Sequence, residues 1–174
     1  MKKLNKIFIL GTSGSGKTTL AKNLSEKMNI SHYNLDDFFW YKRFSKKRNP
    51  KKRDSMILSI LKKRKWIAEG IYGFWTEKFV KKSDLVIWLD YSFGKLSWRN
   101  IKRFIKQREK KSDENLKNLI RIIKYVKNYR KGVHGGSYKS HKEIIDKHQI
   151  NLVIIKNNKQ LKEFMKSLDE KRLK

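Results

Sequence analysis

The stretch Gly11-Thr12-Ser13-Gly14-Ser15-Gly16-Lys17-Thr18 decides the fold of this chain. It matches Gly-x-x-x-x-Gly-Lys-Ser/Thr, a loop whose backbone N–H groups surround phosphate oxygens. The apolar run Ile7–Leu10 precedes the loop, and Leu20, Leu24 and Met28 follow it at helical spacing. A strand before the loop and a helix after it are the context in which this motif binds a nucleoside triphosphate.

Each residue type in the loop has a chemical role. The glycines permit backbone conformations that direct successive N–H groups toward one anion. The Lys17 ammonium would reach the β- and γ-phosphates, and the Thr18 hydroxyl would coordinate Mg²⁺. An ordinary glycine-rich turn is the alternative. We predict an ATP and Mg²⁺ site whose nucleotide-binding residues are Gly11, Thr12, Ser13, Gly14, Ser15, Gly16, Lys17, Thr18 and Thr19.

Short apolar runs alternate with amphipathic stretches along the rest of the chain. The predicted strands are Ile7–Leu10, His32–Leu35, Trp66–Ala68, Leu85–Leu89 and Leu152–Ile155. This alternation is typical of a parallel sheet with helices on both faces. Asn49 and Pro50 are predicted to begin one of the helices. The predicted fold class is α/β, a three-layer P-loop NTPase fold with a five-stranded parallel sheet, in a single kinase-like domain over residues 1–174.

The segment between the fourth and fifth strands contains more helix than a crossover needs. Two helical patterns lie between Phe93 and Arg130, and Ser112-Asp113-Glu114 separates them. We predict a helical lid insertion at about residues 93–131. One face of the first lid helix carries Lys95, Arg99, Lys102, Arg103 and Lys106. These cations form either a solvated stripe or, for the two arginines, a phosphate-binding lid, since a guanidinium matches phosphate geometry.

Composition limits the classes of function. There are 45 Lys and Arg residues against 16 Asp and Glu, a net charge of +29, which predicts nonspecific nucleic acid binding. An AT-rich genome, which favours lysine codons, explains the charge equally well. The chain has no cysteine, which excludes disulfides and thiolate metal sites. No apolar run approaches the ~20 residues that span a bilayer, so we expect a cytoplasmic protein with no membrane contact.

Three further segments make the chain resemble a known family. His32–Trp40 resembles the "H-x-LD-x-x-FW" segment of the adenylate-kinase-like proteins known as DNA topology modulation proteins. Trp66–Tyr72 resembles their "WV-x-DGNY" and Leu85–Asp90 their "VIWLD". The resemblance extends from about Phe8 to Leu168. It implies a P-loop NTPase of the adenylate-kinase-like group that transfers phosphoryl groups, and the family's name implies an effect on DNA topology.

The resemblance also implies roles for charged residues. Asp36 would hold Mg²⁺ through water or orient the accepting hydroxyl, with capping of the next helix as the alternative, for which Asp37 is the better candidate. Glu69 stands where the family carries Asp and would bind a metal-bound water. Arg99 and Arg103 would close over the ATP phosphates. The predicted catalytic residues are Lys17, Asp36, Arg99 and Arg103, and the predicted metal ligands are Thr18, Asp36 and Glu69.

Other charged and polar residues have less defined roles. Asp90 follows a strand and serves either a turn or the metal, and Arg130 is a further lid candidate. The basic clusters Lys46–Arg53 and Lys62–Lys65 are either solvated or bind a nucleic acid backbone. The four histidines lack metal-ligand spacing, and His134 and His141 are predicted to lie at the surface.

The expected acceptor segment differs from that of nucleoside monophosphate kinases. The segment Gly70–Trp75 contains no arginine, which argues against a monophosphate acceptor. Nearby aromatic side chains either stack on a base or belong to the core: Phe38, Phe39, Trp40, Tyr72, Phe74 and Trp75. We predict ATP- and Mg²⁺-dependent phosphoryl transfer to a small molecule, a nucleoside or a nucleotide. The alternative is a nucleic-acid-associated NTP-binding protein that affects DNA topology.

Overall fold

The computed structural model describes residues 4–42, 46–71, 73–109, 116–132 and 136–170. Five parallel strands form its main sheet in the order β2-β5-β1-β6-β7. They are β2 (His32–Asn34), β5 (Trp66–Gly70), β1 (Lys6–Gly11), β6 (Leu85–Leu89) and β7 (Leu152–Ile155). The predicted five-stranded parallel sheet is therefore confirmed. Strand β5 is two residues longer than its apolar run, because it continues through Glu69 and Gly70.

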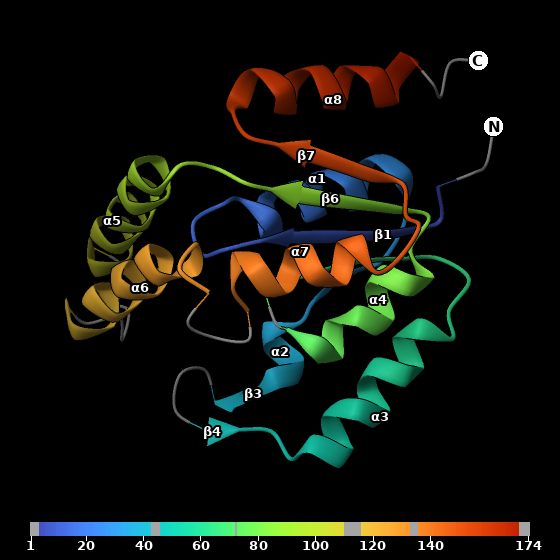
Figure 1. Cartoon of the computed structure of the whole chain (residues 1–174), viewed down its shortest axis with the longest axis horizontal. Helices are drawn as coiled ribbons and strands as arrows, with labels where there is room; N and C mark the ends of the chain where they lie inside the picture. The colour runs from blue at the N-terminus through green and yellow to red at the C-terminus, as the bar shows by residue number, and fades with distance from the viewer. Residues whose placement is uncertain (1–3, 43–45, 72, 110–115, 133–135, 171–174) are drawn as a thin grey trace.

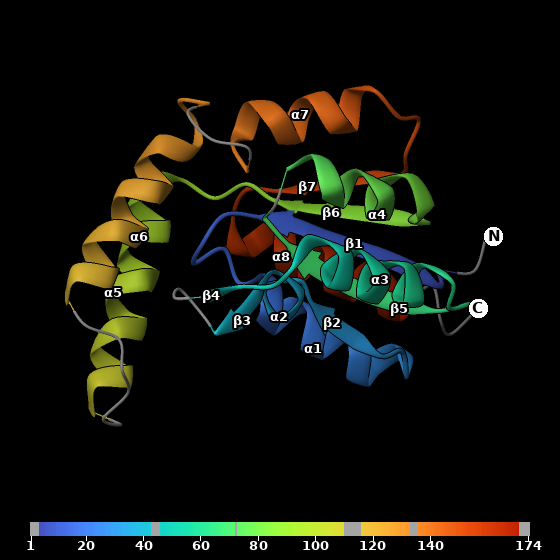
Figure 2. The ribbon, with the colours of Figure 1, turned by 90° about the horizontal axis from the view of Figure 1, so that it is seen from below.

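The central strand β1 is buried on both faces of the sheet. Ile7 and Ile9 face the core cluster that includes α1 (Lys17–Met28) and α8 (Asn158–Glu170). Phe8 and Leu10 face the opposite cluster, formed with helices α3 (Pro50–Leu61), α4 (Glu77–Lys82) and α7 (Tyr138–Asp146). The helices form a layer on each face (Figure 1; Figure 2). Burial on both faces explains why these strands read as unbroken apolar runs.

The start of α3 is as predicted. The Asn49 side chain accepts a hydrogen bond from Lys51 N at 2.9 Å, and Pro50 is the first helical residue. The prediction that Asp37 is a cap is wrong. It lies inside the short helix α2 (Asp36–Phe39), and Asn34 Oδ1 accepts the Asp36 N–H at 2.9 Å.

Two helices occupy the segment predicted to form a lid, α5 (Phe93–Glu109) and α6 (Leu116–Tyr129). They lie beyond the carboxyl ends of the strands, at the left of Figure 1. Leu96, Ile122 and Val126 join the core cluster on the α1 side of the sheet, so the base of the lid is continuous with the domain core. The predicted break at Ser112–Glu114 lies outside the described residues.

Some elements were not predicted from the sequence. A small antiparallel hairpin, β3 (Trp40–Lys42) and β4 (Lys46–Lys47), follows α2, and a 3₁₀ turn covers Phe74–Thr76. Helices α7 and α8 flank β7. The prediction that His141 lies at the surface is wrong: α7 packs over the sheet, and the imidazole is fully buried. His134 and Tyr72 lie outside the described residues. Among the residues described, no helix is long and apolar enough to cross a bilayer.

Candidate active site

The phosphate-binding loop joins the end of β1 to the start of α1. Gly16 occupies the N-cap of α1 with φ 93°, and Gly14 has φ 78°, both in the region that favours glycine. A Cβ on Gly14 would lie 2.4 Å from Asn100 Nδ2 on α5. Glycine is therefore required at position 14 by conformation and by close approach. The loop presents its N–H groups at a helix N-terminus, where the helix dipole favours an anion.

The loop contains a lysine directed back over its backbone and two buried hydroxyls without hydrogen-bond partners among the described residues. Lys17 Nζ donates to Thr12 O at 3.2 Å, so the ammonium arches back over the loop. Thr12 Oγ1 and Ser15 Oγ are buried, and neither has a hydrogen-bond partner among the described residues. A buried hydroxyl without a partner costs about 1–3 kcal/mol. These orphaned hydroxyls beside a cationic side chain fit an anionic phosphate group.

Two predicted metal ligands meet beside the loop. Thr18 Oγ1 donates to Glu69 Oε1 at 2.6 Å, and Glu69 is only 2% exposed within β5. The register of β2 against β5 places Asn34 opposite Glu69, so Asp36 follows two residues beyond this point at the same sheet edge. A hydroxyl and carboxylates are oxygen ligands of the kind Mg²⁺ prefers. The residues present therefore fit a Mg²⁺-nucleotide, although no group of three or more acidic or histidine ligands occurs among the described residues.

A histidine lies behind this carboxylate. His32 Nε2 on β2 is 4.0 Å from Glu69 Oε1. Burial is the main cause that lowers the pKa of His32 below its ordinary value, with Lys22 acting in the same direction. The negative charges of Glu69 and Asp37 oppose the shift. The lowered pKa favours the neutral form of the imidazole. Sequence reasoning gave His32 no role, because its relation to Glu69 depends on strand pairing.

Helix α5 contacts the loop through two side chains. Arg99 Nη1 donates to Ser15 O at 3.1 Å and Gly14 O at 3.4 Å, and Nη2 donates to Asn158 Oδ1 at 3.0 Å. Asn100, which is buried, accepts from Ser13 Oγ at 3.0 Å and donates to Ser13 O at 3.2 Å. Arg99 is therefore attached to the loop rather than solvated. The contact of Arg99 with phosphate stays a prediction. The role of Asn100 in holding the loop was not predicted from the sequence.

The guanidinium of Arg99 also lies 4.4 Å above the centre of the Tyr91 ring, and Lys95 Nζ lies 4.8 Å above the same ring. Tyr91 follows β6 and is buried. Arg103 is one turn farther along α5 and half-buried. At the start of α5, the first two residues of the predicted cationic face, Lys95 and Arg99, therefore contact the Tyr91 ring.

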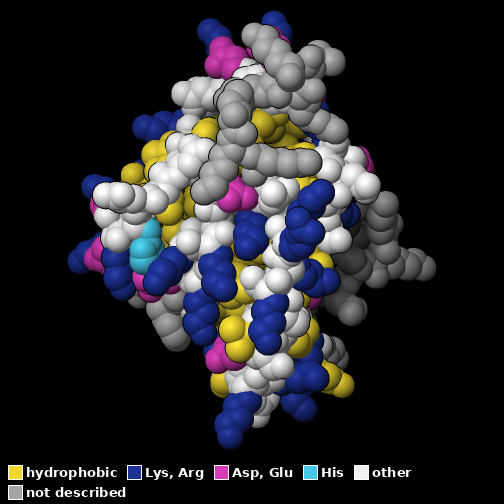
Figure 3. Space-filling view, turned by 90° about the vertical axis from the view of Figure 1, so that its right-hand side faces the viewer, with side chains coloured by type: hydrophobic (Ala, Val, Ile, Leu, Met, Phe, Trp, Pro, Cys, Tyr) yellow, Lys and Arg dark blue, Asp and Glu magenta, His cyan; other side chains and the backbone are white. Residues whose placement is uncertain are grey.

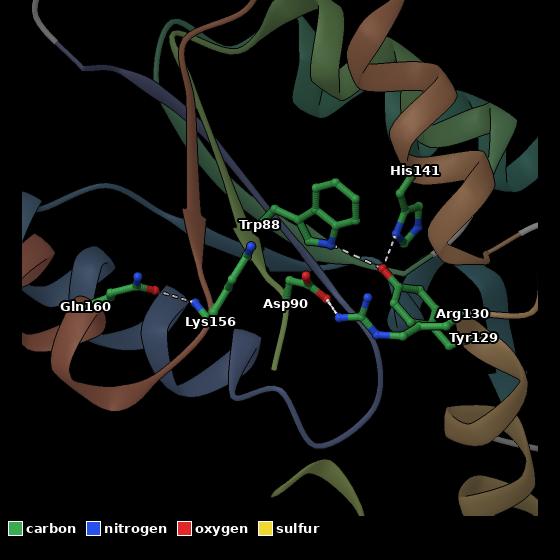
Figure 4. Close-up of polar contacts among 7 residues, drawn as sticks. All are labelled: Trp88, Asp90, Tyr129, Arg130, His141, Lys156 and Gln160. Atoms are coloured by element: carbon green, nitrogen blue, oxygen red, sulfur yellow. Dashed lines mark hydrogen bonds and ion pairs between the residues drawn. The ribbon is translucent and has the colours of Figure 1, made fainter. Parts of the chain in front are cut away.

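A chain of hydrogen bonds fixes the base of α6 (Figure 4). Trp88 Nε1 donates to Tyr129 Oη at 3.1 Å, and Tyr129 Oη lies 2.9 Å from His141 Nδ1. His141 Nε2 lies 2.7 Å from Ile71 O. Since a carbonyl only accepts, Nε2 carries the proton and the tyrosine donates to Nδ1. Burial raises the pKa of Tyr129, so the phenol keeps its proton.

An ion pair lies beside this chain. Arg130 Nη2 donates to Asp90 Oδ1 at 2.6 Å (Figure 4). The Arg130 guanidinium also lies 4.8 Å above the centre of the Tyr138 ring. Asp90, which is 6% exposed, thus holds a lid arginine at the end of β6. After the neighbouring strand β7, the side chain of Gln160 on α8 accepts the Lys156 N–H at 2.7 Å and closes the turn between the two elements.

A pocket of about 310 Å³ opens beside α2. Its lining residues are Asp36, Asp37, Trp40, Tyr41 and Arg48. Arg48 Nη2 donates to Asp37 O at 3.1 Å and Trp40 O at 3.3 Å, and its guanidinium lies 5.7 Å from the centre of the Tyr41 ring. The sequence placed Arg48 only in a basic cluster, because the short hairpin that directs it to the pocket has no pattern of its own.

The other predicted aromatic residues divide between core and undescribed positions. Phe38 and Phe39 are half-buried against the core on the α3 side, and Trp75 is a buried member of that core. Phe39 stacks on Trp75 with ring centres 6.4 Å apart. Tyr72 and the Phe74 side chain lie outside the described residues. Trp40 is the member of the predicted set that lines the pocket.

The two basic clusters lie far apart. Lys46 and Lys47 belong to the hairpin beside the pocket, whereas Lys62–Lys65 precede β5 at the amino end of the sheet and are exposed. Figure 3 shows the molecule from the end opposite α5 and α6, where Lys and Arg side chains spread over the surface. The second cluster is therefore separate from the phosphate-binding loop.

Comparisons with known proteins bear on the fold and on the phosphate-binding loop. A family model described as an AAA domain matches residues 7–71, which include the loop and Glu69. The uncharacterized protein YqaC of Bacillus subtilis is 33% identical over 103 residues, which cover 56% of this chain and 58% of YqaC. The chain thus matches little more than half of that relative's length.

Several solved structures have the same fold. Shikimate kinase from Acinetobacter baumannii, solved with shikimate, is 15% identical with a TM-score of 0.60 and coverage of 99% of this chain and 97% of its own. Shikimate kinase from Bacteroides thetaiotaomicron is 18% identical with a TM-score of 0.54 and coverage of 97% and 98%. An uncharacterized protein from Eubacterium ventriosum is also 18% identical, with a TM-score of 0.54 and coverage of 97% and 99%. These likenesses and the AAA-domain match support a P-loop NTPase with a kinase-like fold.

Proposed function

We propose that this protein is an ATP- and Mg²⁺-dependent kinase that phosphorylates a small acceptor bound beside α2. One observation carries the proposal: the Thr18–Glu69 hydrogen bond lies at the sheet edge where Asp36 begins the wall of a pocket. Open α/β sheets bind ligands along this edge. A kinase needs the nucleotide and the acceptor to meet at such a point, so that the acceptor hydroxyl can attack the γ-phosphorus.

The loop residues would bind the nucleotide. On binding, Lys17 would exchange the Thr12 carbonyl for phosphate oxygens, and the Thr12 and Ser15 hydroxyls would gain acceptors. Thr18 would ligate Mg²⁺, with Glu69 and Asp36 acting through water. The chemistry that bound Mg²⁺ supplies is neutralisation of charge on the phosphates. The loop likewise supplies fixed donors that need no rearrangement during the reaction.

The pocket beside α2 would bind the acceptor, a nucleoside, nucleotide or related metabolite. Asp36 would orient the attacking hydroxyl. Trp40 and Tyr41 offer planar faces, and Arg48 adds a cation held by backbone carbonyls. Arg99 and Arg103 would close over the phosphates from α5. The location would be the cytoplasm, where ATP and Mg²⁺ are plentiful.

A second candidate function is favoured by the exposed Lys62–Lys65 cluster and the +29 charge (Figure 3). In this alternative the protein is the nucleic-acid-associated NTP-binding protein implied by its resemblance to DNA topology modulation proteins. Binding to a phosphate backbone would then fall steeply as salt rises.

Screening a panel of nucleosides, nucleotides and hydroxylated metabolites for ADP production tests the first candidate. We expect one acceptor to raise ADP production well above the acceptor-free rate, and Asp36→Asn to abolish that rise while ATP still binds. Asp146→Asn, at an exposed position on α7, is the matched control. No acceptor-dependent ADP, together with DNA affinity that depends steeply on salt, would favour the second candidate.

A further inference from the structure

The Glu69 carboxylate is buried, and among the described residues it accepts one short hydrogen bond. Its side chain is 3% exposed, and Thr18 Oγ1 donates to Oε1 at 2.6 Å. A carboxylate has about four lone-pair sites, and burial without further donors is costly. A second donor near this carboxylate would therefore stabilise its charged form and fix its rotation.

His32 is placed to be that donor. It lies on β2, next to β5, and Nε2 is 4.0 Å from Glu69 Oε1. Nε2 is buried and has no hydrogen-bond partner among the described residues. A gap of 4.0 Å is closed by a small side-chain movement or by one bridging water.

We propose that His32 is a positioning residue that donates from Nε2–H to the Glu69 carboxylate, directly or through one water, and thereby sets the Mg²⁺ affinity of the nucleotide site. This inference rests on the proposed function. Glu69 accepts a hydrogen bond from the Thr18 hydroxyl, which leaves the lone pairs of Oγ1 directed away from the carboxylate and available to the metal. If the carboxylate rotates, that hydroxyl loses its orientation. Outer partners of this kind change metal affinity by about 10- to 100-fold.

Binding of Mn²⁺, as a substitute for Mg²⁺, to the protein saturated with ADP tests the proposal. Free Mn²⁺ is measured by electron paramagnetic resonance, so the readout does not depend on turnover. We expect His32→Leu to weaken Mn²⁺ binding by about tenfold while metal-free ADP affinity is unchanged. His32→Gln, whose amide nitrogen can take the place of Nε2, should restore most of the affinity.

A matched control is His148→Leu. His148 is also half-buried and also faces a glutamate, with Nε2 2.8 Å from Glu77 Oε1, but it is remote from β2. It should leave Mn²⁺ binding unchanged. Wild-type Mn²⁺ affinity in His32→Leu would overturn the role of His32. Failure of the wild-type protein to bind Mn²⁺ with ADP would instead contradict the proposed function itself.

A second measurement needs no substitution of His32. In protein labelled with ¹⁵N-histidine, Glu69→Gln should shift the ring nitrogen resonances of His32 and leave those of His148 in place. The physical reason is that Gln removes the charge that the Nε2–H group faces. Unmoved His32 resonances would overturn the proposal even if His32→Leu fails to fold.

Discussion

Two hydroxyls of the phosphate-binding loop and two arginines of the neighbouring lid differ in their hydrogen bonding. In the loop, Thr12 Oγ1 and Ser15 Oγ are buried without hydrogen-bond partners in the described part of the chain. In the lid, Arg99 donates to loop carbonyls and to Asn158, and Arg130 is paired with Asp90. The loop keeps donors for a ligand, whereas these two arginines already stabilise the protein.

This difference changes how a lid arginine can act. Arg99 cannot add a phosphate contact with the same N–H groups unless it releases Ser15 O or Asn158. Its present contacts instead fix the carbonyl groups of the loop outward, which leaves the loop N–H groups free to turn toward an anion. The loop and the lid are thus one preorganised unit at this point, and substitutions can separate the two contributions.

The largest expected effect is that of Lys17→Ala. The substitution removes the ammonium that would face the β- and γ-phosphates and leaves only backbone and hydroxyl donors. Turnover should fall by about 100-fold or more, the order found when one preorganised charge stabiliser is lost. Calorimetry should also show a sharp loss of ATP affinity with the fold intact. Lys62→Ala, at the opposite end of the sheet, is the charge-matched control, and equal losses in both variants would refute the assignment of the loop.

The next largest effects on activity are expected for Arg99→Ala and Arg103→Ala. If these arginines stabilise the transition state, kcat should fall by roughly 10² while ATP affinity falls much less. Lys95→Ala and Lys106→Ala, which flank the pair on the same helix, should be nearly silent. If Arg99 acts only by holding Ser15 O and Gly14 O, its loss should instead weaken ATP binding and leave kcat nearly unchanged. Steady-state kinetics and calorimetry on the four variants distinguish these results.

The difference between loop and lid also explains what the sequence could predict. The loop is eight contiguous residues between an apolar run and a helix. Its phosphate-binding chemistry depends on local sequence and can therefore be predicted from it. The contacts of Arg99 with Ser15 and of His141 with Ile71 join residues 84 and 70 positions apart. No periodicity encodes them. His141 is a single buried polar residue in a mixed segment, and its burial depends on the surfaces that pack around it.

The pocket proposed for the acceptor could not be predicted from the sequence, for a related reason. Arg48 directly follows a hairpin whose strands have three and two residues, which is too short for an alternating pattern. The lysines of the hairpin are typical of a solvated basic segment. Glu69 interrupted the apolar run of β5, so the strand was predicted to end early. Such departures from local pattern are expected at functional sites.

Tyr129→Phe tests how the base of the lid is held. Loss of the hydroxyl removes the acceptor of Trp88 Nε1 and the hydroxyl that lies 2.9 Å from His141 Nδ1, both in the buried core. An unsatisfied buried polar group costs about 1–3 kcal/mol, so the free energy of unfolding should fall by that amount. Urea unfolding measures the change. Tyr41→Phe, at an exposed ring, is the control. An equal effect in both variants would show that the hydrogen-bond chain does not stabilise the lid base.

The smallest expected effect concerns the other end of α7, where a surface cluster parallels the buried chain. Glu77 Oε1 lies 2.9 Å from Lys147 Nζ and 2.8 Å from His148 Nε2. Hydrogen bonds from Lys147 and then His148 are the main causes that hold the pKa of Glu77 below its ordinary value.

A lowered carboxyl pKa contributes stability that is present above the ordinary value and lost as pH falls through the folded-state value. Glu77→Gln should therefore lower the free energy of unfolding at pH 7 by about 1 kcal/mol or less, and the gap should narrow as the pH falls from 7 to 3. Thermal unfolding of both proteins at the two pH values measures this, with Tyr129→Phe as the comparison whose gap persists at pH 3. A Glu77 gap that is as large at pH 3 as at pH 7 would show that α7 is held here by packing rather than by charge.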